Sequence, residues 1–208
     1  MRSEAVSWFS SAYYTAVHVP ATIAFLIWLF WRGRDHFGQW RNILAITTGF
    51  CLVVRFWRVA PPRFLTDLGY VDLPAQFGLS PYGPVGTGVS PQFAAMPSIH
   101  VAWAAVVSFG VVAASRSRHR HWYLLHLIIT LLVVAATGHH WWLDGIVAIA
   151  FVGLAWWIDR LGRRVLARFV ADDGEDQVTS SGGGSGQTVD RTESKVVGAP
   201  SPSIAANA

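Results

Sequence analysis

Two short stretches of the sequence, residues 96–100 and 139–144, carry side chains suited to catalysis where long apolar segments begin. The first reads Met-Pro-Ser-Ile-His and the second His-His-Trp-Trp-Leu-Asp. An ionisable side chain next to hydrocarbon is costly to bury, and membrane proteins that keep one usually use it. We therefore expect His100, His140 and Asp144 to take part in chemistry.

His140 and Asp144 are spaced i and i+4, which puts both on one face of a helix. A carboxylate there keeps one imidazole nitrogen protonated and frees the other, as a nucleophilic or basic histidine requires. One helix, a basic turn and a second helix separate His100 from His140. The chain therefore returns to the same membrane depth, and His100 and His140 can face one pocket. A His-x-x-x-Asp pair alone is common by chance, so the catalytic interpretation depends on His100.

Two features near these residues are suited to binding an anion. Pro97 and Ser98 fit the first turn of a helix, where free backbone amides bind phosphate. Pro61 and Pro62 would hold Arg63 near the membrane surface, and a guanidinium is the usual clamp for phosphoryl oxygens. The alternative for Arg63 is an interfacial anchor that reaches lipid phosphates.

The elements that must position these residues are membrane-spanning helices. The chain is 52% hydrophobic and 13% charged, with its apolar residues in long runs, which is typical of an integral membrane protein. We predict an all-α membrane protein, a polytopic helical bundle with about five transmembrane helices, the first of them retained rather than cleaved as a signal peptide. The predicted spans are residues 13–31, 42–60, 97–114, 122–138 and 141–159.

The arginines predict the orientation, because short cytoplasmic loops carry the excess of basic residues. They follow the first, third and fifth predicted spans: Arg32, Arg34, Arg41, Arg116, Arg118, Arg120, Arg160, Arg163, Arg164 and Arg168. An outside N-terminus places all of these in the cytoplasm and the loop 61–96 outside. We therefore expect a multi-pass plasma membrane protein of bacterial type with an extracytoplasmic active site.

The chain divides into a transmembrane catalytic domain, residues 1–170, and a polar tail, residues 171–208, predicted to be disordered and cytoplasmic. A regulatory role for the tail is the alternative to a solvated end. There is no Gly-rich nucleotide loop and no cysteine-based metal site, and we expect the membrane as a partner and no nucleic acid. The sequence carries no signal for an oligomeric state.

Pro-Pro-Arg, then Pro-Ser-x-His, then His-x-x-x-Asp, in this order, resemble the phosphatidic acid phosphatase type 2 superfamily, in its branch similar to inositol phosphorylceramide synthases. The resemblance covers roughly residues 8–160. It implies that His140 attacks phosphorus to form a phosphohistidine, that Asp144 orients His140, and that His100 protonates the leaving group. It also implies that Ser98 and Arg63 bind the phosphoryl oxygens, and that no metal and no cofactor is needed.

Two departures from the superfamily pattern affect the phosphate clamp. The arginine expected six residues before the nucleophilic histidine is Val134 here, and the Lys-x6-Arg-Pro motif is reduced to Pro-Pro-Arg. Arg55, Arg58 or His139 are candidates for the missing donor. Arg55 and Arg58, near the outer end of the second predicted span, are equally well explained without a role in the clamp, and His139 is equally well explained as an interfacial neighbour.

Two further polar residues, His18 and Asp72, are expected to be structural. The family usually has six spans, whereas five are predicted here.

We expect a lipid phosphatase or phosphotransferase that acts on a lipid phosphate through a phosphohistidine. Transfer to an alcohol headgroup of the inositol type, rather than to water, is an alternative with the same first step. The rivals from other classes are a haem- or metal-binding membrane protein that uses the histidines as ligands, and a non-catalytic lipid-binding protein.

Overall fold

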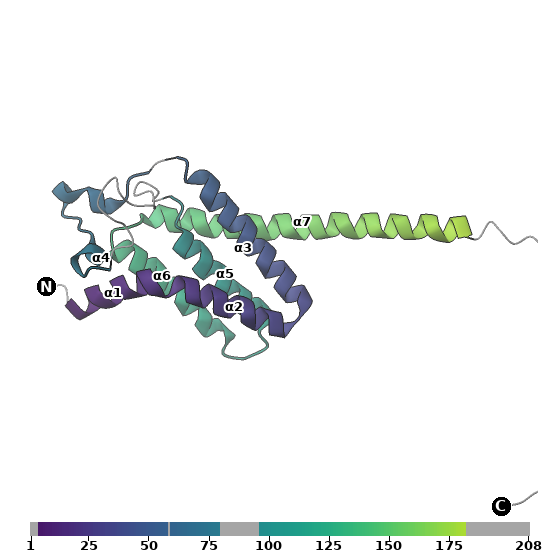
Figure 1. Ribbon diagram of the computed structural model, residues 1–208, viewed down its shortest axis with the longest axis horizontal. Coiled ribbons are helices and arrows are strands. Elements are labelled where there is room, and N and C mark those ends of the chain that lie inside the picture. The colour runs from purple at the N-terminus through teal and green to yellow at the C-terminus, as the bar shows by residue number, and fades with distance from the viewer. Residues whose placement is uncertain (1–3, 58, 80–95, 182–208) are drawn as a thin grey trace, which may run out of the picture. The chain divides into compact units, whose positions relative to one another are not determined.

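The computed structural model describes residues 4–57, 59–79 and 96–181, with side chains as far as Phe169. These residues form seven α-helices and three short 3-10 turns (Figure 1). Two compact units divide the chain, Met1–Val165 and Leu166–Ala208. The α-helices are α1 (Glu4–Ala16), α2 (His18–Arg32), α3 (Arg34–Val54), α4 (Leu73–Gln76), α5 (Ile99–Ala114), α6 (Leu124–Ala136) and α7 (Trp142–Ser181).

All five segments predicted to be helical contain a helix, so the all-α class is confirmed. By length and composition, one helical stretch is suited to crossing a membrane, Trp142–Phe169 of α7. The bent pair α1 and α2 would make a second. Apolar α5 and the stretch Arg120–Ala136 are shorter than such spans. The described residues therefore support an all-α protein with one or two candidate spans.

The first predicted span is a bent pair of helices rather than one straight helix. The helices α1 and α2 meet at an angle of 50° around Val17. Pro20 explains the break, because it has no N–H to donate to Ala16 four residues earlier and its ring crowds that carbonyl. The bend brings His18, the first residue of α2, onto the buried face of this helix together with Thr22, Phe25 and Leu29.

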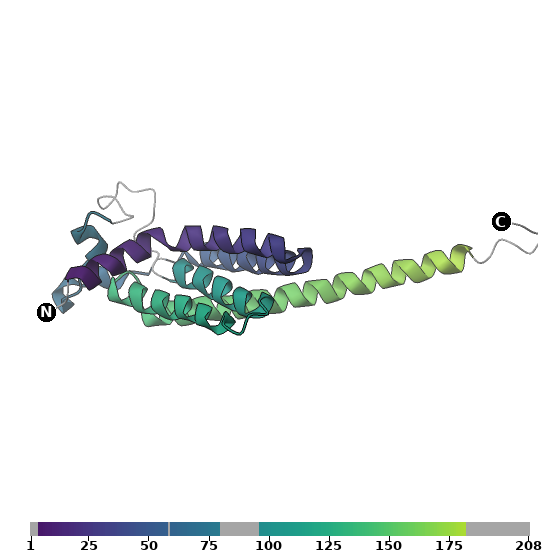
Figure 2. The ribbon, with the colours of Figure 1, turned by 90° about the horizontal axis from the view of Figure 1, so that it is seen from below.

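The core of the first unit is built around α5, which packs against α2, α3 and α6. Figure 2 shows α2 and α3 in one layer and α5 and α6 in the next. Small residues allow this close packing: a Cβ on Gly110 of α5 would lie only 2.2 Å from the ring of Phe25, and one on Gly145 of α7 only 2.6 Å from Leu131. A Cβ on Gly145 would also lie 3.8 Å from Val101, so the start of α7 lies beside the start of α5.

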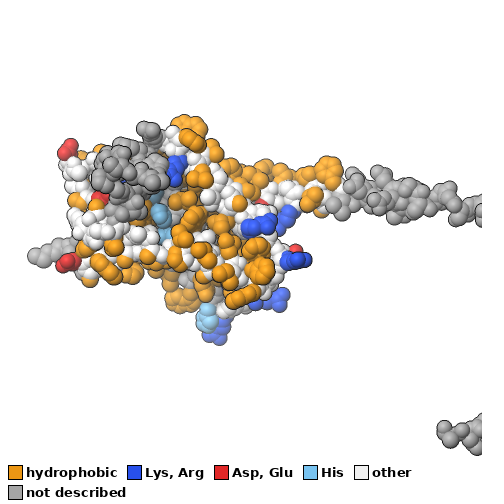
Figure 3. Space-filling model, viewed as in Figure 1, with side chains coloured by type: hydrophobic (Ala, Val, Ile, Leu, Met, Phe, Trp, Pro, Cys, Tyr) orange, Lys and Arg blue, Asp and Glu red, His pale blue; other side chains and the backbone are white. Residues whose placement is uncertain are grey.

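The surface of the first unit is widely apolar (Figure 3). On α2, large apolar side chains cover the face opposite the core: Val19, Ile23, Ile27, Phe30 and Trp31 are exposed. Apolar patches of this extent are rare on soluble monomers and fit contact with lipid. Arginine side chains gather where α2 meets α3 and where α5 leads to α6 (Figure 3).

The segment between α3 and α5 contains the 3-10 turns Pro62–Phe64 and Thr66–Leu68, followed by α4. Asp72 is the N-cap of α4, and its Oδ1 accepts the Ala75 N–H at 3.1 Å. The short helix α4 packs against α1. This segment therefore folds back over one end of the helices.

The end of α7 differs from the predicted tail. Residues 171–181, which we expected to be disordered, continue α7 as far as Ser181. A helix satisfies its own backbone groups without a core, so a polar composition alone does not end it. The rest of that prediction, residues 182–208, lies outside the described residues.

Candidate active site

His140 and Asp144 come together at the start of α7, as their spacing predicts. His140 Nδ1 lies 3.4 Å from Asp144 Oδ2, and both side chains are buried. The same carboxylate oxygen accepts the Trp141 N–H at 2.8 Å, which fixes the turn before the helix. A carboxylate only accepts, so Nδ1 of His140 carries the hydrogen and, in the neutral ring, Nε2 carries the lone pair.

His100 faces His140 from the start of α5, with 6.1 Å between the ring centroids. Ser98 is the N-cap of α5, and its buried Oγ accepts the Val101 N–H at 3.4 Å. The Ser98 N–H donates to the Asp144 carbonyl at 3.4 Å and so ties the two helix starts together. Ser98 is thus one residue before the helix rather than inside its first turn, and the first turn of α5 still presents free amides beside His100.

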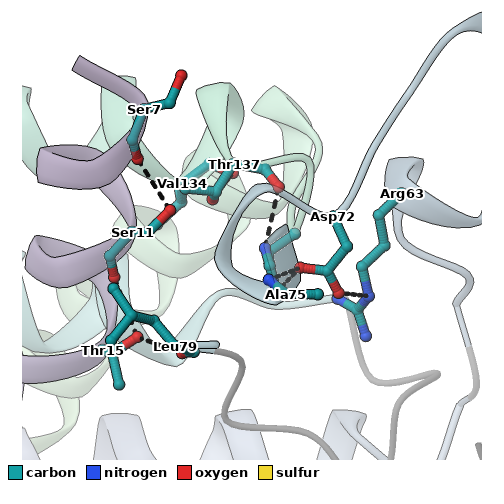
Figure 4. Close-up of polar contacts among 10 residues, drawn as sticks. Ser7, Ser11, Thr15, Arg63, Asp72, Ala75, Leu79, Val134 and Thr137 are labelled. Carbon is teal, nitrogen blue, oxygen red and sulfur yellow. Dashed lines mark hydrogen bonds and ion pairs between the residues drawn. The ribbon is translucent and has the colours of Figure 1, made fainter. Parts of the chain in front are cut away.

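Arg63 is buried against the turn that precedes His140. Its backbone N–H donates to the Gly138 carbonyl at 2.9 Å. Its Nε lies 3.4 Å from Oδ2 of Asp72, and Figure 4 shows these two side chains pointing toward each other. Asp72 thus has two structural roles, as the N-cap of α4 and as the partner of this guanidinium. The contact with Arg63 joins two parts of a loop, so no local sequence pattern indicated it.

His139 is buried next to His140, and its ring centroid lies 4.6 Å from that of Tyr14. Its Nδ1 donates to the Thr137 carbonyl at 3.1 Å. Its Nε2 lies 3.7 Å from Asp72 Oδ1. Burial and the charge of Arg63 lower the pKa of His139 to about 3, so this contact is not an ion pair at neutral pH.

The other candidates for the phosphate clamp are less central. Arg55 is the C-cap residue of α3, with its backbone N–H on the Cys51 carbonyl at 3.1 Å. Arg58 lies outside the described residues. Val134 is part of the hydrophobic core, so the position at which the superfamily pattern has an arginine is filled by an apolar side chain. Arg63 is tied to the turn before His140 through the Gly138 carbonyl, and His139 is the neighbour of His140 in the chain.

Gly138 is a residue that sequence reasoning missed. It has φ +71°, and a Cβ there would lie 3.2 Å from the Val71 carbonyl oxygen and 3.6 Å from Arg63 Cβ. Trp141 anchors the same turn through an indole hydrogen bond to the Ala60 carbonyl at 3.0 Å. A glycine directly before His-His was the available sequence signal, because glycine is the residue that adopts this backbone at no steric cost.

We predict that Gly138→Ala lowers the Tm of the purified protein in detergent. Left-handed backbone costs an alanine roughly 1–2 kcal/mol, and the added methyl also pushes on the Val71 carbonyl. Gly153→Ala is the matched control, because Gly153 is helical and a Cβ there meets nothing within 4 Å. An equal or higher Tm for Gly138→Ala than for Gly153→Ala would contradict the strain argument.

The comparison with known protein families decides what kind of site this is. The sequence profile described as PAP2 superfamily matches residues 1–158, which is most of the chain. The chain belongs to the PAP2 superfamily. Enzymes of this superfamily are typically phosphatases or phosphotransferases that act on phosphate esters. No curated protein and no solved structure matches the chain.

The match includes the three stretches that carry the site: the Pro-Pro-Arg turn, the start of α5 and the start of α7. Within residues 4–57, 59–79 and 96–169, no three His, Cys, Asp or Glu side chains have the geometry of a metal site. Membership in the PAP2 superfamily suggests a phosphate ester as the substrate.

Proposed function

We propose that this chain is an integral membrane lipid phosphatase or phosphotransferase that works through a phosphohistidine on His140. The observation that carries the proposal is the pairing of His140 with Asp144 opposite His100, each at the start of a different helix. Membership in the PAP2 superfamily supports the substrate class, a phosphate ester. The exposed apolar surface supports a lipid as the carrier of that ester.

In the first step, Nε2 of His140 forms a bond to phosphorus while the bond from phosphorus to the ester oxygen breaks. His100 gives its proton to the departing oxygen, so the alcohol leaves neutral. Asp144 stabilises the positive charge that the His140 ring gains. In the second step an incoming oxygen attacks phosphorus, His100 takes its proton, and His140 is released.

The incoming group decides between the two reactions. Water gives free phosphate, and an alcohol headgroup gives a new ester, as in the inositol phosphorylceramide synthase-like branch that the sequence resembles. The phosphoryl oxygens would be held by Arg63 and by the Ser98 hydroxyl and backbone amides at the start of α5. His139 would be a further donor only if its N–H left the Thr137 carbonyl. Arg63 is suited to this because Asp72 already fixes its guanidinium.

Phosphate release over a panel of lipid phosphates, in detergent and with or without added inositol or glycerol, tests the proposal. We expect release that vanadate inhibits, since vanadate takes up the geometry of the attacked phosphorus. A phosphotransferase would form a new lipid ester when the alcohol is present. Neither release nor transfer with any lipid, from protein that is folded by gel filtration, would refute the proposed function.

We also propose five spans, with the arginine-bearing loops in the cytoplasm and the active site outside. This orientation predicts the labelling of single cysteines in a Cys51→Ser background. In intact cells, an impermeant thiol reagent should label Leu68→Cys, whose position is 72% exposed between α3 and α4, and not Ser117→Cys between α5 and α6. Both should react after lysis. Labelling of Ser117→Cys alone in intact cells would place the site in the cytoplasm.

A further inference from the structure

His18 belongs to none of the motifs of the site, and yet it lies against His100. It is the first residue of α2, on the inner side of the bend between α1 and α2, and only 3% of its surface is exposed. The two ring centroids are 4.8 Å apart, with the rings nearly perpendicular at 71°. His140 lies on the catalytic side of His100 at 6.1 Å. His100 therefore has a second histidine neighbour, and it is the closer one.

The hydrogen bond of His18 defines its tautomer. Nδ1 lies 3.3 Å from the Tyr14 carbonyl oxygen, and a carbonyl only accepts, so Nδ1 carries the hydrogen. In the neutral ring, Nε2 is then an acceptor. Nε2 of His18 is buried and has no hydrogen-bond partner among the described residues. A buried acceptor without a hydrogen bond lowers the stability of the fold, so its presence calls for an explanation.

His100 has the complementary requirement. Its Nδ1 is buried and lacks a hydrogen-bond partner within the described part of the chain, although the side chain as a whole is partly exposed. Asp144 contacts His140, and no carboxylate contacts His100 in the described ranges. The ring of Tyr14 packs on His100 at 4.4 Å between centroids and limits its rotation. A general acid needs its second nitrogen held, and here the group beside it is an imidazole.

We propose that His18 is a positioning residue for His100. The two nitrogens are not hydrogen-bonded in the structure, and when His100 is protonated its Nδ1–H turns to Nε2 of His18, which directs the other nitrogen of His100 toward the leaving group. The proposal rests on the function proposed above. The bend between α1 and α2 contributes to this placement, because it puts His18, the first residue of α2, on the buried face of a helix that packs against α5. The N-terminal helices would then contribute to proton transfer as well as to packing.

Two substitutions at His18 separate the roles of its nitrogens. In His18→Asn the side-chain amide can replace Nδ1 as the donor to the Tyr14 carbonyl, but nothing reaches the place of Nε2. In His18→Gln the longer side chain puts an acceptor near that place. His126→Asn is the control for a change beside His18: His126 is a partly buried histidine whose Nδ1 contacts the Tyr13 hydroxyl at 2.6 Å and whose ring centroid lies 6.1 Å from that of His18.

The readout is kcat for two phosphate esters of the same lipid-like tail. One has an alkyl leaving group that needs a proton, and the other has a nitrophenyl leaving group that does not. We expect His18→Asn to lower kcat roughly tenfold or more on the alkyl ester, the usual effect of removing a residue that orients a catalytic side chain. On the nitrophenyl ester kcat should change little, because that leaving group needs no proton. His18→Gln should recover part of the loss. His126→Asn should leave the ratio of the two rates as in wild type.

A second measurement uses the background variant His100→Ala. If His18 acts through His100, adding His18→Asn to His100→Ala should cost nothing further on the alkyl ester. An independent tenfold loss in the double variant would overturn the proposal. So would equal losses of His18→Asn on both esters, or no loss on either. If His18→Asn does not fold, His18→Leu is compared with His18→Gln instead. Leucine keeps the bulk of the side chain but lacks an acceptor, so the same loss of kcat on the alkyl ester is expected.

The proposed function fails in a different way from this inference. Wild-type protein that releases nothing from either ester, or His140→Ala that still turns over, would overturn the phosphohistidine mechanism and this inference with it. Wild-type turnover that depends on His140, together with a leaving-group ratio unchanged in His18→Asn, would overturn the role of His18 alone.

Discussion

Replacing His140 by alanine should abolish phosphate release, because no other side chain can carry the phosphoryl group between the two steps. Asp144→Asn should keep the fold and lower kcat on the order of 10⁴-fold, the loss that follows when a triad histidine is held in the wrong tautomer. In the structure Asp144 Oδ2 accepts from the Trp141 N–H and contacts His140 Nδ1. In Asp144→Asn, either the side-chain NH₂ group or the amide oxygen would face these same two donors. The measurement is single-turnover release of phosphate from a lipid phosphate.

The control for this loss is His119→Ala, which removes an exposed histidine from the connection between α5 and α6 and should retain full activity. A covalent label gives an independent check: protein quenched during turnover should retain acid-labile phosphate in wild type and none in His140→Ala. Activity of His140→Ala within tenfold of wild type, or a label that survives in this variant, would rule out His140 as the nucleophile.

The part of the site that lies on helices could be predicted from the sequence. The spacing of His140 and Asp144 sets their contact, because a helix brings residues four apart together. The position of His100 followed from counting one helix out and one helix back, since both helices start at the same end of the bundle. In both cases local periodicity determines the geometry, so no knowledge of the packing was needed.

The parts that were missed depend on contacts between distant segments. Asp72 reaches Arg63 across the segment of 3-10 turns, and Gly138 is required because the Val71 carbonyl and Arg63 press on it. His18 is set against His100 by a bend at Pro20. A proline within an apolar run marks a bend, but the direction of the bend depends on what packs beside it.

Five spans were predicted, whereas the described residues contain one or two helical stretches suited to crossing a membrane by length and composition. A hydropathy window counts apolar residues and does not see where a helix begins or ends. The structure starts α6 at Leu124, after a 3-10 turn, and divides the first segment at Val17, so two predicted spans are shorter or bent. Length in residues and length across a bilayer differ once a helix is broken.

Arg63→Ala should lower kcat by about 10² to 10³, the usual effect of removing one preorganised donor from a developing negative charge. The attacked phosphorus carries that charge on its equatorial oxygens, and Val134 in the core leaves the superfamily's arginine position without a donor. Arg63→Lys should recover only part of the rate, because an ammonium cannot reproduce the planar fork that Asp72 holds through Nε at 3.4 Å. Asp72→Asn should give a smaller loss, since the guanidinium stays but loses its ionic partner.

Vanadate inhibition distinguishes this role from membrane anchoring. If Arg63 holds the equatorial oxygens, vanadate should inhibit Arg63→Ala more weakly than wild type, in parallel with the fall in kcat. Arg118→Ala, which removes an exposed arginine between α5 and α6, is the matched control and should match wild type in both measurements. Unchanged vanadate inhibition in Arg63→Ala would assign Arg63 to anchoring and move the clamp to Arg55, Arg58 or His139. Because burial and the charge of Arg63 lower the pKa of His139 to about 3, this ring is neutral at pH 7, and it could donate only by releasing the Thr137 carbonyl.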